Sequence, residues 1–160
     1  MRITIGVIFA ILLKLSFNAW ADSSAADLSV EPAADIKPGE VVQIVVDALR
    51  INDSQTGDEG IATVWRFAAP GNKAVTGPLP RFSQMLKGGF ADMLNHVDSE
   101  YGPIIIEDDL AVQPVWLITP SGDEVGYVFH IRKQGAGDYD GIWMTEAVFP
   151  IPPRDSGTSI

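Results

Sequence analysis

The second half of the chain carries apolar runs that predict β-strands. Four runs rich in Ile, Val, Trp, Tyr and Phe are separated by acidic or Gly-containing breaks, as is typical of strands joined by turns. They cover residues 103–107, 110–120, 124–133 and 142–149. Because the connections are short, the pattern predicts an antiparallel sheet, mainly four-stranded.

A turn at Ser121 and Gly122 sets the predicted register of the second and third runs. A two-residue turn places Pro120 opposite Asp123, and every later pair follows from that one. The face predicted to be buried then pairs Trp116 with Tyr127, Pro114 with Phe129, and Val112 with Ile131. The other face pairs Leu117 with Gly126, Val115 with Val128, and Gln113 with His130. Pro114 has no amide hydrogen, so we expect it at an edge position or a bulge.

The first half of the chain shows helical spacing instead. One apolar stripe begins after Pro38, and a second lies between Asp58, a suitable N-cap, and Pro70, which we expect to end the helix. A third, shorter helix opens at Pro80 and is broken at Gly88. A last helical turn is predicted for residues 90–94. The stripes consist of Val42, Val45, Val46 and Leu49; of Ile61, Val64, Trp65 and Ala68; and of Leu79, Phe82, Met85 and Leu86.

The order of these elements predicts an α+β fold. Helices come first and the sheet last, without βαβ alternation, so we expect N-terminal helices packed on one face of a curved antiparallel sheet. We assign residues 38–152 to this single domain, residues 22–37 to a flexible linker and residues 153–160 to a C-terminal tail.

Residues 1–21 have the pattern of a secretory signal peptide. Arg2 precedes an apolar run, and Ala19 and Ala21 give a small-x-small cleavage signature. The alternative is an uncleaved anchor, which needs about 20 apolar residues, whereas this run is shorter and contains Lys14. We therefore expect cleavage after Ala21, a periplasmic or secreted product, and no stable membrane insertion afterwards.

Charge and cysteine content narrow the functional classes. The full chain has a net charge of −10, and cleavage would remove two basic residues and no acidic one, leaving −12. Nucleic acids and anionic membranes call for a basic patch, so neither is an expected partner. The chain has no cysteine, which excludes disulfides and Cys-based zinc or redox chemistry.

Several short motifs resemble a bacterial family known as domain of unknown function 4864. They are Gly60 to Phe67, then Ala69, Pro70, Gly71 and Asn72, then Thr76, Gly77, Pro78, Leu79 and Phe82, and later Gly141, Ile142, Trp143, Met144 and Thr145. The likeness covers roughly residues 38–152. That family is similar in outline to the nuclear-transport-factor-like (cystatin-like) α+β cone, in which a curved sheet wraps helices and often leaves a pocket. The resemblance implies a fold and carries over no catalytic residue.

Metal and cofactor chemistry find little support. The run from Asp138 to Gly141 resembles the middle of a calcium loop, but aligning its glycine puts Ala136 and Ala147 where the first and last ligands belong. A plain turn is therefore favoured. No HxxH or HExxH motif and no Gly-rich phosphate loop occurs, so we expect no metal and no cofactor.

Acid–base catalysis is the alternative to binding. Its weak candidates are Asp92, His96, Gln113, His130 and Glu146, of which His130 has Gln113 as a predicted neighbour that could orient its ring. A polar pair on a solvated sheet face is the favoured interpretation of these two.

The hypothesis we favour is an exported domain that binds a small or apolar ligand or a protein partner, with enzyme as the second choice. We expect a pocket between helices and sheet, walled by Trp65, Trp116, Tyr127 and Trp143. A third hypothesis is a homodimer formed through an outer sheet face marked by Val115, Leu117 and Val128, with no pocket.

Overall fold

The computed structural model describes residues 27–154. The predicted signal peptide therefore lies outside the described residues, together with the start of the linker and the last six residues. None of the helices within this range has the length and hydropathy that crossing a lipid bilayer requires.

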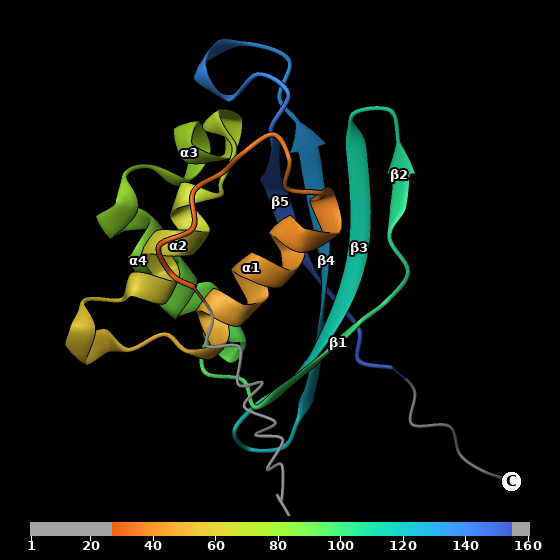
Figure 1. Ribbon diagram of the computed structural model, residues 1–160. Coiled ribbons are helices and arrows are strands. Elements are labelled where there is room, and N and C mark those ends of the chain that lie inside the picture. Colours follow the sequence, from red (N-terminus) through yellow and green to blue (C-terminus); the bar gives the residue numbers. More distant parts are fainter. Residues whose placement is uncertain (1–26, 155–160) are drawn as a thin grey trace, which may run out of the picture.

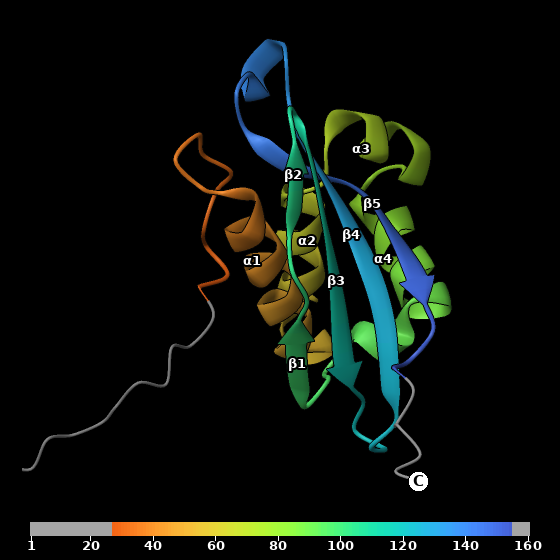
Figure 2. The same cartoon turned by 90° about the vertical axis from the view of Figure 1, so that its right-hand side faces the viewer.

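The domain has two layers, one of helices and one of sheet (Figure 1). The helical layer comes first in the chain, as predicted. Its members are α1 (Pro38–Arg50), α2 (Glu59–Arg66), α3 (Pro70–Thr76) and α4 (Leu79–Gly89). Short 3₁₀ turns occur at Ser54–Thr56, Ala91–Met93 and Gly137–Tyr139. In both ribbon views the four helices lie on one side of the sheet and leave its other side bare (Figure 2).

α1 is the central helix and begins where the sequence predicts. Pro38 suits the first turn, where no amide hydrogen is needed, and the Glu40 carboxylate accepts a hydrogen bond from the Lys37 amide at 2.7 Å. Its apolar stripe is wider than a single i, i+3, i+4 row. The buried apolar side chains are Val41, Val42, Val45, Val46, Ala48 and Leu49.

The region after α1 differs from the prediction in two ways. Asp58 directly precedes α2, but its carboxylate makes no capping bond; it accepts hydrogen bonds from Asn52 Nδ2 (3.1 Å) and Lys87 Nζ (2.5 Å). Pro70 does not simply end a helix, since it is the first residue of α3. Proline is well suited to the first position of a helix, so Pro70 both prevents α2 from continuing and begins α3.

The sheet has five strands within the described residues, one more than predicted. They are β1 (Asp98–Tyr101), β2 (Ile105–Glu107), β3 (Leu110–Ile118), β4 (Glu124–Lys133) and β5 (Trp143–Ile151). The order is β1-β3-β4-β5, with β2 also paired to β3, and every pair is antiparallel. The sequence of β1 is mostly polar, which is why an apolar-run criterion misses it. The α+β class with helices on a curved sheet is confirmed.

The predicted register of β3 and β4 is wrong by one residue. Ile118 lies opposite Glu124, and the loop between them contains a turn in which the Gly122 amide donates to the Thr119 carbonyl at 2.9 Å. The Thr119 amide donates to the Asp123 carbonyl at 2.9 Å, so the connection is a three-residue loop, with Gly122 at φ 91° and Pro120 at a favoured turn position. One extra residue exchanges the two faces of a strand. The observed pairs include Trp116 with Gly126, Val115 with Tyr127, Pro114 with Val128, Gln113 with Phe129, and Val112 with His130.

Pro114 is accommodated at a break in the neighbouring strands. Of the two predicted positions, an edge and a bulge, the edge is wrong, because β3 pairs on both sides; the irregularity lies in the neighbouring strands instead of in a bulge of β3. Gly102 donates its amide hydrogen to the Pro114 carbonyl at 2.9 Å, so the missing hydrogen of the proline faces the same neighbour. There β1 stops at Tyr101 and β2 starts only at Ile105. The chain that runs beside β3 is therefore divided into β1 and β2 at the position of the proline.

The described part of the expected linker is attached to the domain. Arg66 donates hydrogen bonds to the carbonyls of Leu28 (2.9 Å) and Val30 (3.0 Å), and Thr63 also donates to Leu28 (3.1 Å). Leu28, Val30 and Ile36 pack against the core. Residues 27–37 thus lie along the helical layer instead of forming a loose tether.

α1 and α2 approach each other closely at Gly60. A Cβ atom added there would lie 2.2 Å from the Ala48 carbonyl oxygen, which belongs to the backbone of α1 and cannot move aside alone. A glycine at this position is therefore a packing requirement.

We predict that Gly60→Ala lowers the free energy of unfolding by about 3 kcal/mol, since it forces two packed helices apart. Urea denaturation measures the change. Gly88→Ala is the matched control, because nothing lies within 4 Å of the added methyl group, and it should leave stability unchanged or raise it by up to about 1 kcal/mol. Equal stabilities of the two variants would contradict the prediction.

Candidate functional site

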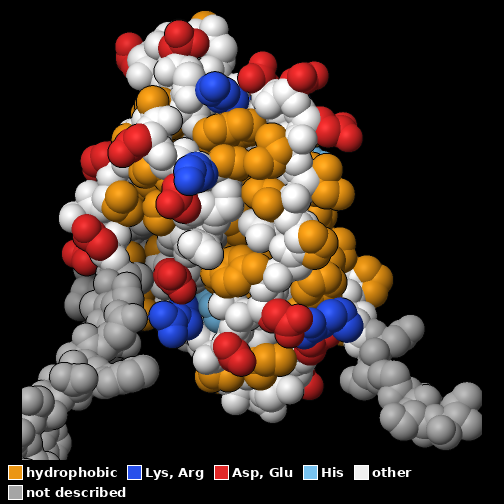
Figure 3. All heavy atoms as spheres, turned by 45° about the vertical axis from the view of Figure 1, so that its right-hand side comes forward, with side chains coloured by type: hydrophobic (Ala, Val, Ile, Leu, Met, Phe, Trp, Pro, Cys, Tyr) orange, Lys and Arg blue, Asp and Glu red, His pale blue; other side chains and the backbone are white. Residues whose placement is uncertain are grey.

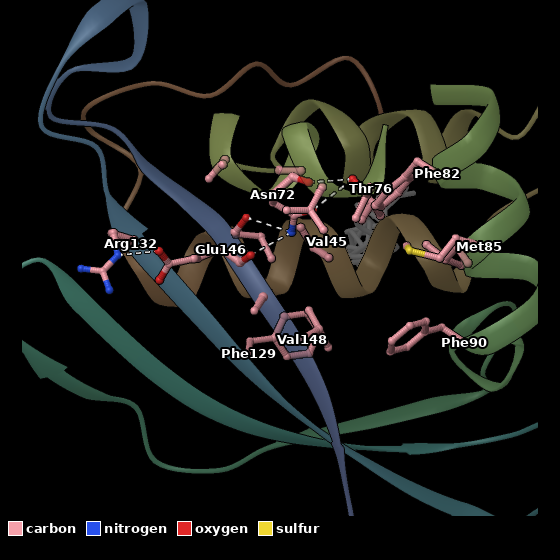
Figure 4. A pocket seen from close by; sticks show the side chains of 18 of the residues that line it. Val45, Asn72, Thr76, Phe82, Met85, Phe90, Phe129, Arg132, Glu146 and Val148 are labelled. Carbon is pink, nitrogen blue, oxygen red and sulfur yellow. Dashed lines mark hydrogen bonds and ion pairs between the residues drawn. The ribbon is translucent and has the colours of Figure 1, made fainter. Parts of the chain in front are cut away.

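A cavity of about 570 Å³ lies between the helices and the β4–β5 side of the sheet (Figure 4). This volume is within the range of small-molecule sites. α1, α2, α3 and α4 all contribute to the wall, together with β4, β5 and the turn after α4. A pocket between helices and sheet was predicted, and the structure contains one.

Most of the wall is apolar. Val45 and Leu49 come from α1, Val64 from α2, Phe82, Met85 and Leu86 from α4, Phe90 and Met93 from the turn after it, and Phe129 and Val148 from the sheet. In Figure 4 the side chains of Met85 and Phe90 lie across an open space from Phe129 and Val148. Met85 is 37% exposed, so it stands at the mouth, while Phe129 is fully buried.

One end of the cavity is polar. Arg132 and Glu146 lie there and form an ion pair with 2.8 Å between Nε and Oε1. Gln134, just beyond the end of β4, donates from Nε2 to the Arg132 carbonyl at 2.9 Å. The pair with Glu146 raises the pKa of the Arg132 guanidinium, so this end holds one fixed positive and one negative charge.

β5 is joined to the helical layer at Thr145. The Thr145 amide donates to the Phe67 carbonyl (2.8 Å), and the Ala69 amide donates to the Thr145 carbonyl (2.9 Å). Asn72 Nδ2 adds bonds to the carbonyls of Thr145 (3.4 Å) and Glu146 (3.0 Å). This connection forms the corner of the cavity and fixes α3 beside β5.

Thr145 lines the cavity, but neighbouring atoms cover its hydroxyl. Thr145 is only 3% exposed, and its hydroxyl makes no hydrogen bond within residues 27–154. An unpartnered buried hydroxyl costs stability, so its presence in the wall calls for an explanation.

The aromatic residues predicted to wall the pocket do not line it. Trp116 lies on the opposite face of the sheet, as a consequence of the corrected register. Tyr127 is buried behind Phe90, with 6.1 Å between the ring centroids. Trp65 donates from Nε1 to the Gly77 carbonyl at 3.3 Å, and Trp143 packs against the core. The rings used instead are those of Phe82, Phe90 and Phe129.

The residues that sequence analysis missed had detectable signals. Phe82 and Met85 belong to the predicted apolar stripe of α4, but a stripe does not say which members face a void. Asn72 lies in a motif that supports the family resemblance, as do Thr76 and Thr145. In the structure these motif residues gather at the corner between α3 and β5.

The five candidate catalytic residues are dispersed. Asp92 is exposed in the turn after α4, and Glu146 lies at the polar end of the cavity. Gln113 is buried on the inner face and donates from Nε2 to the Gly102 carbonyl at 3.0 Å. His130 lies on the outer face against Phe149, with 5.2 Å between ring centroids. The predicted pairing of Gln113 with His130 is wrong, because the two residues lie on opposite faces of the sheet.

His96, the remaining candidate, is a buried structural residue. The residue is 2% exposed, and its Nδ1 donates to the Met93 carbonyl at 2.8 Å. Nε2 has no partner among the described residues. Burial lowers the pKa of this histidine below its ordinary value of 6.5, although the bond to Met93 opposes the shift.

The bare face of the sheet is a second apolar surface. It carries Ile105, Val112, Pro114, Trp116, Ile118, Val128, Phe149 and Ile151, and we call this set the outer sheet face. Figure 3 shows hydrophobic side chains gathered there, with charged groups toward both ends. Phe149 is 51% exposed and Ile105 is 60% exposed. Val115 and Leu117, predicted for this face, are instead fully buried in the core.

Arg154 folds onto one end of the outer sheet face. Its guanidinium lies 4.8 Å from the ring centroid of Trp116 and pairs with Glu100 and with Glu124, the latter at 2.7 Å. The start of the predicted tail is thus tied to the sheet.

Within residues 27–154, no three carboxylate or histidine side chains are grouped so that they could hold a metal ion. Comparisons with protein-family models, curated proteins and solved structures find no match for this chain. The resemblance to the family known as domain of unknown function 4864 stays a prediction, and the site rests on its own geometry.

We predict that His96 makes stability depend on pH. Since its folded-state pKa is lowered, the unfolded chain binds the proton first, and stability falls as pH drops below 6.5 toward the folded-state pKa. The slope should reach at most about 1.4 kcal/mol per pH unit. His96→Asn, whose amide can still donate to Met93, should lose this part of the slope when unfolding is measured by urea titration at several pH values. An unchanged slope would contradict the assignment.

Proposed function

We propose that this protein binds a small, largely apolar ligand in the cavity between its helices and β5. The observation that carries the proposal is the combination of volume and lining: about 570 Å³, walled mainly by aliphatic and aromatic side chains, with few polar groups and both charged ones at one end. Ligand sites commonly have this composition, in which apolar area supplies affinity and a few polar groups fix orientation. We also propose that it does so in the cell envelope, as the expected leader implies.

The polar groups of the cavity support binding more than catalysis. A general base must lie within hydrogen-bond reach of the group it deprotonates. The cavity contains one carboxylate, Glu146, and that carboxylate is already engaged by Arg132. Neither histidine lines the cavity. The candidates for acid–base chemistry therefore do not converge on the space that a substrate would occupy.

α3 and the mouth of the cavity support access for a ligand. α3 has no buried residue, contains Gly71 in its first turn and is followed by Gly77, whose φ of 84° is a glycine conformation. Its attachment to the sheet runs largely through the polar bonds of Asn72. Val75 on α3 is 77% exposed and Met85 on α4 is 37% exposed, so apolar side chains flank the entrance.

We predict that a hydrophobic fluorescent probe, N-phenyl-1-naphthylamine, binds saturably to one site and raises the melting temperature. At a free concentration 100 times the dissociation constant, binding stabilises the fold by about 2.7 kcal/mol. Met85→Trp should weaken binding at least about tenfold, because the larger ring occupies the mouth. Isothermal titration calorimetry measures the dissociation constants of the unaltered chain and the variant, and differential scanning calorimetry measures the melting temperature.

The matched control for this experiment is Gln84→Trp, at the preceding position of the same helix. Gln84 is exposed and does not line the cavity, so this variant should bind the probe as the unaltered chain does. Equal weakening in both variants, or no saturable binding to the unaltered chain, would contradict the proposal.

A second candidate function is self-association through the outer sheet face. The observation that favours it is an apolar surface without helical cover, with Phe149 half-exposed at its side. Such uncovered patches are common at protein interfaces. A second copy supplies a matching surface of the same chemistry, because a two-fold interface pairs one patch with itself.

We predict that sedimentation equilibrium detects a dimer, and that Phe149→Glu dissociates it by placing two like charges in the interface. Gln84→Glu, which adds the same charge to α4, should leave the association constant unchanged. A chain that is monomeric at all concentrations tested would eliminate this second candidate without affecting the first.

A further inference from the structure

Polarity changes along the cavity from one end to the other. β4 and β5 are antiparallel, so the beginning of β5 lies beside the end of β4, where Thr145 is opposite Ile131. Thr145, Glu146, Arg132 and Gln134 all belong to this end. Three residues further along β5, Val148 lies opposite Phe129, and the wall is apolar from there on. Figure 4 shows the same arrangement, with Arg132 and Glu146 on one side and Met85 and Phe90 on the other.

Hydrocarbon side chains form the wall at the apolar end, where Met85 borders the mouth. Phe82, Leu86 and Met93 are each 5% exposed or less, and Leu49 is 1% exposed. No charged side chain lines this part of the cavity. A ligand group placed here gains from burial but can make no hydrogen bond with a side chain, so it has to be an alkyl chain or a similar apolar group.

The polar end offers hydrogen bonds without a net charge. Arg132 and Glu146 are the two charged residues of the lining, and they are bonded to each other. The remaining polar side chains of the lining are amides and hydroxyls: Gln134 and Thr145 belong to this end, whereas Asn72 and Thr76 lie on α3 and are bonded to each other, with Thr76 beside Phe82 in Figure 4. A charged head group could bind Arg132 or Glu146 only by displacing the other residue from the ion pair. An anion would in addition approach a chain whose net charge is −10.

The Thr145 hydroxyl lacks a partner and is covered by its neighbours, and Gln134 donates one amide hydrogen to a neighbouring carbonyl, which leaves its second amide hydrogen and its side-chain oxygen for a ligand. A hydroxyl group on a ligand can both donate and accept. Such a group matches the unsatisfied hydrogen-bonding capacity at this end better than a group that only donates or only accepts.

We propose that the ligand is a single-chain amphiphile with an uncharged, hydroxyl-bearing head, such as a fatty-acid monoester of glycerol. This inference rests on the binding function proposed above and specifies its ligand class. The head lies by Thr145, Gln134 and the ion pair, and the chain runs toward Phe90 and Met93. At roughly 30 Å³ for each non-hydrogen atom, the volume of a liquid water molecule, the cavity holds on the order of twenty such atoms.

The test compares three twelve-carbon amphiphiles that differ in head charge: 1-monolauroylglycerol, laurate and dodecyltrimethylammonium. Each displaces N-phenyl-1-naphthylamine from the full exported chain below its micelle concentration, at two salt concentrations. We expect the glycerol ester to bind at least about tenfold more tightly than either ion. Equal or tighter binding of laurate or of the cation overturns the inference and leaves the binding function standing. Failure of all three and of the probe to bind overturns both.

Thr145→Val tests the position of the head, because it removes the hydroxyl and keeps the shape of the side chain. We expect binding of 1-monolauroylglycerol to weaken about threefold to tenfold, with the affinity for N-phenyl-1-naphthylamine unchanged. The unliganded variant should melt no lower than the unaltered chain, since the hydroxyl it loses has no partner. If the variant fails to fold, Gln134→Met applies the same test from the residue that follows β4. Unchanged binding of the glycerol ester in a folded variant places its head elsewhere and overturns the inference.

Discussion

The pairing of Phe67 and Ala69 with Thr145 holds the helical layer to the sheet on the side where the cavity lies. β5 is the edge strand there, and its backbone groups at Thr145 would otherwise be left without partners. A short segment between α2 and α3 satisfies them, and Asn72 reaches past it to the next carbonyl. These bonds set the distance between α3 and β5, and with it the width of the cavity.

The same corner is reinforced by a cation between two aromatic rings. Lys73 Nζ donates to the Arg66 carbonyl (3.3 Å) and lies 4.6 Å from the ring centroid of Trp65 and 5.4 Å from that of Tyr139. Burial lowers the pKa of this ammonium group, but its aromatic neighbours favour the charged form. The contact joins α2, α3 and the loop between β4 and β5. Trp65 therefore serves the frame of the site and not its wall.

How far the sequence could predict the structure depended on the range of the interaction. α1 was predictable because its stripe and Pro38 are local signals, and the α+β class followed from the order of such signals. The register of β3 was not, because a loop of two or of three residues at Gly122 fits the same apolar alternation, and Pro120 was a cue for the longer one. That single residue moved Trp116 to the outer sheet face. The candidate site suffered most, since a cavity exists only after the register and the helix positions are fixed.

Small residues explain why the space between α3 and β5 stays open. Ala68 and Ala69 are 4% exposed or less and line the cavity together with Gly71 and Ala147. A Leu or Phe at any of these positions would fill part of the volume and gain burial energy of about 1.5–3 kcal/mol. The small residues do not provide this burial energy, and the nearby Thr145 hydroxyl has no hydrogen-bond partner among the described residues. The proposed ligand accounts for both unfavourable features at this corner, since binding sites tend to lose stability that the rest of the fold supplies.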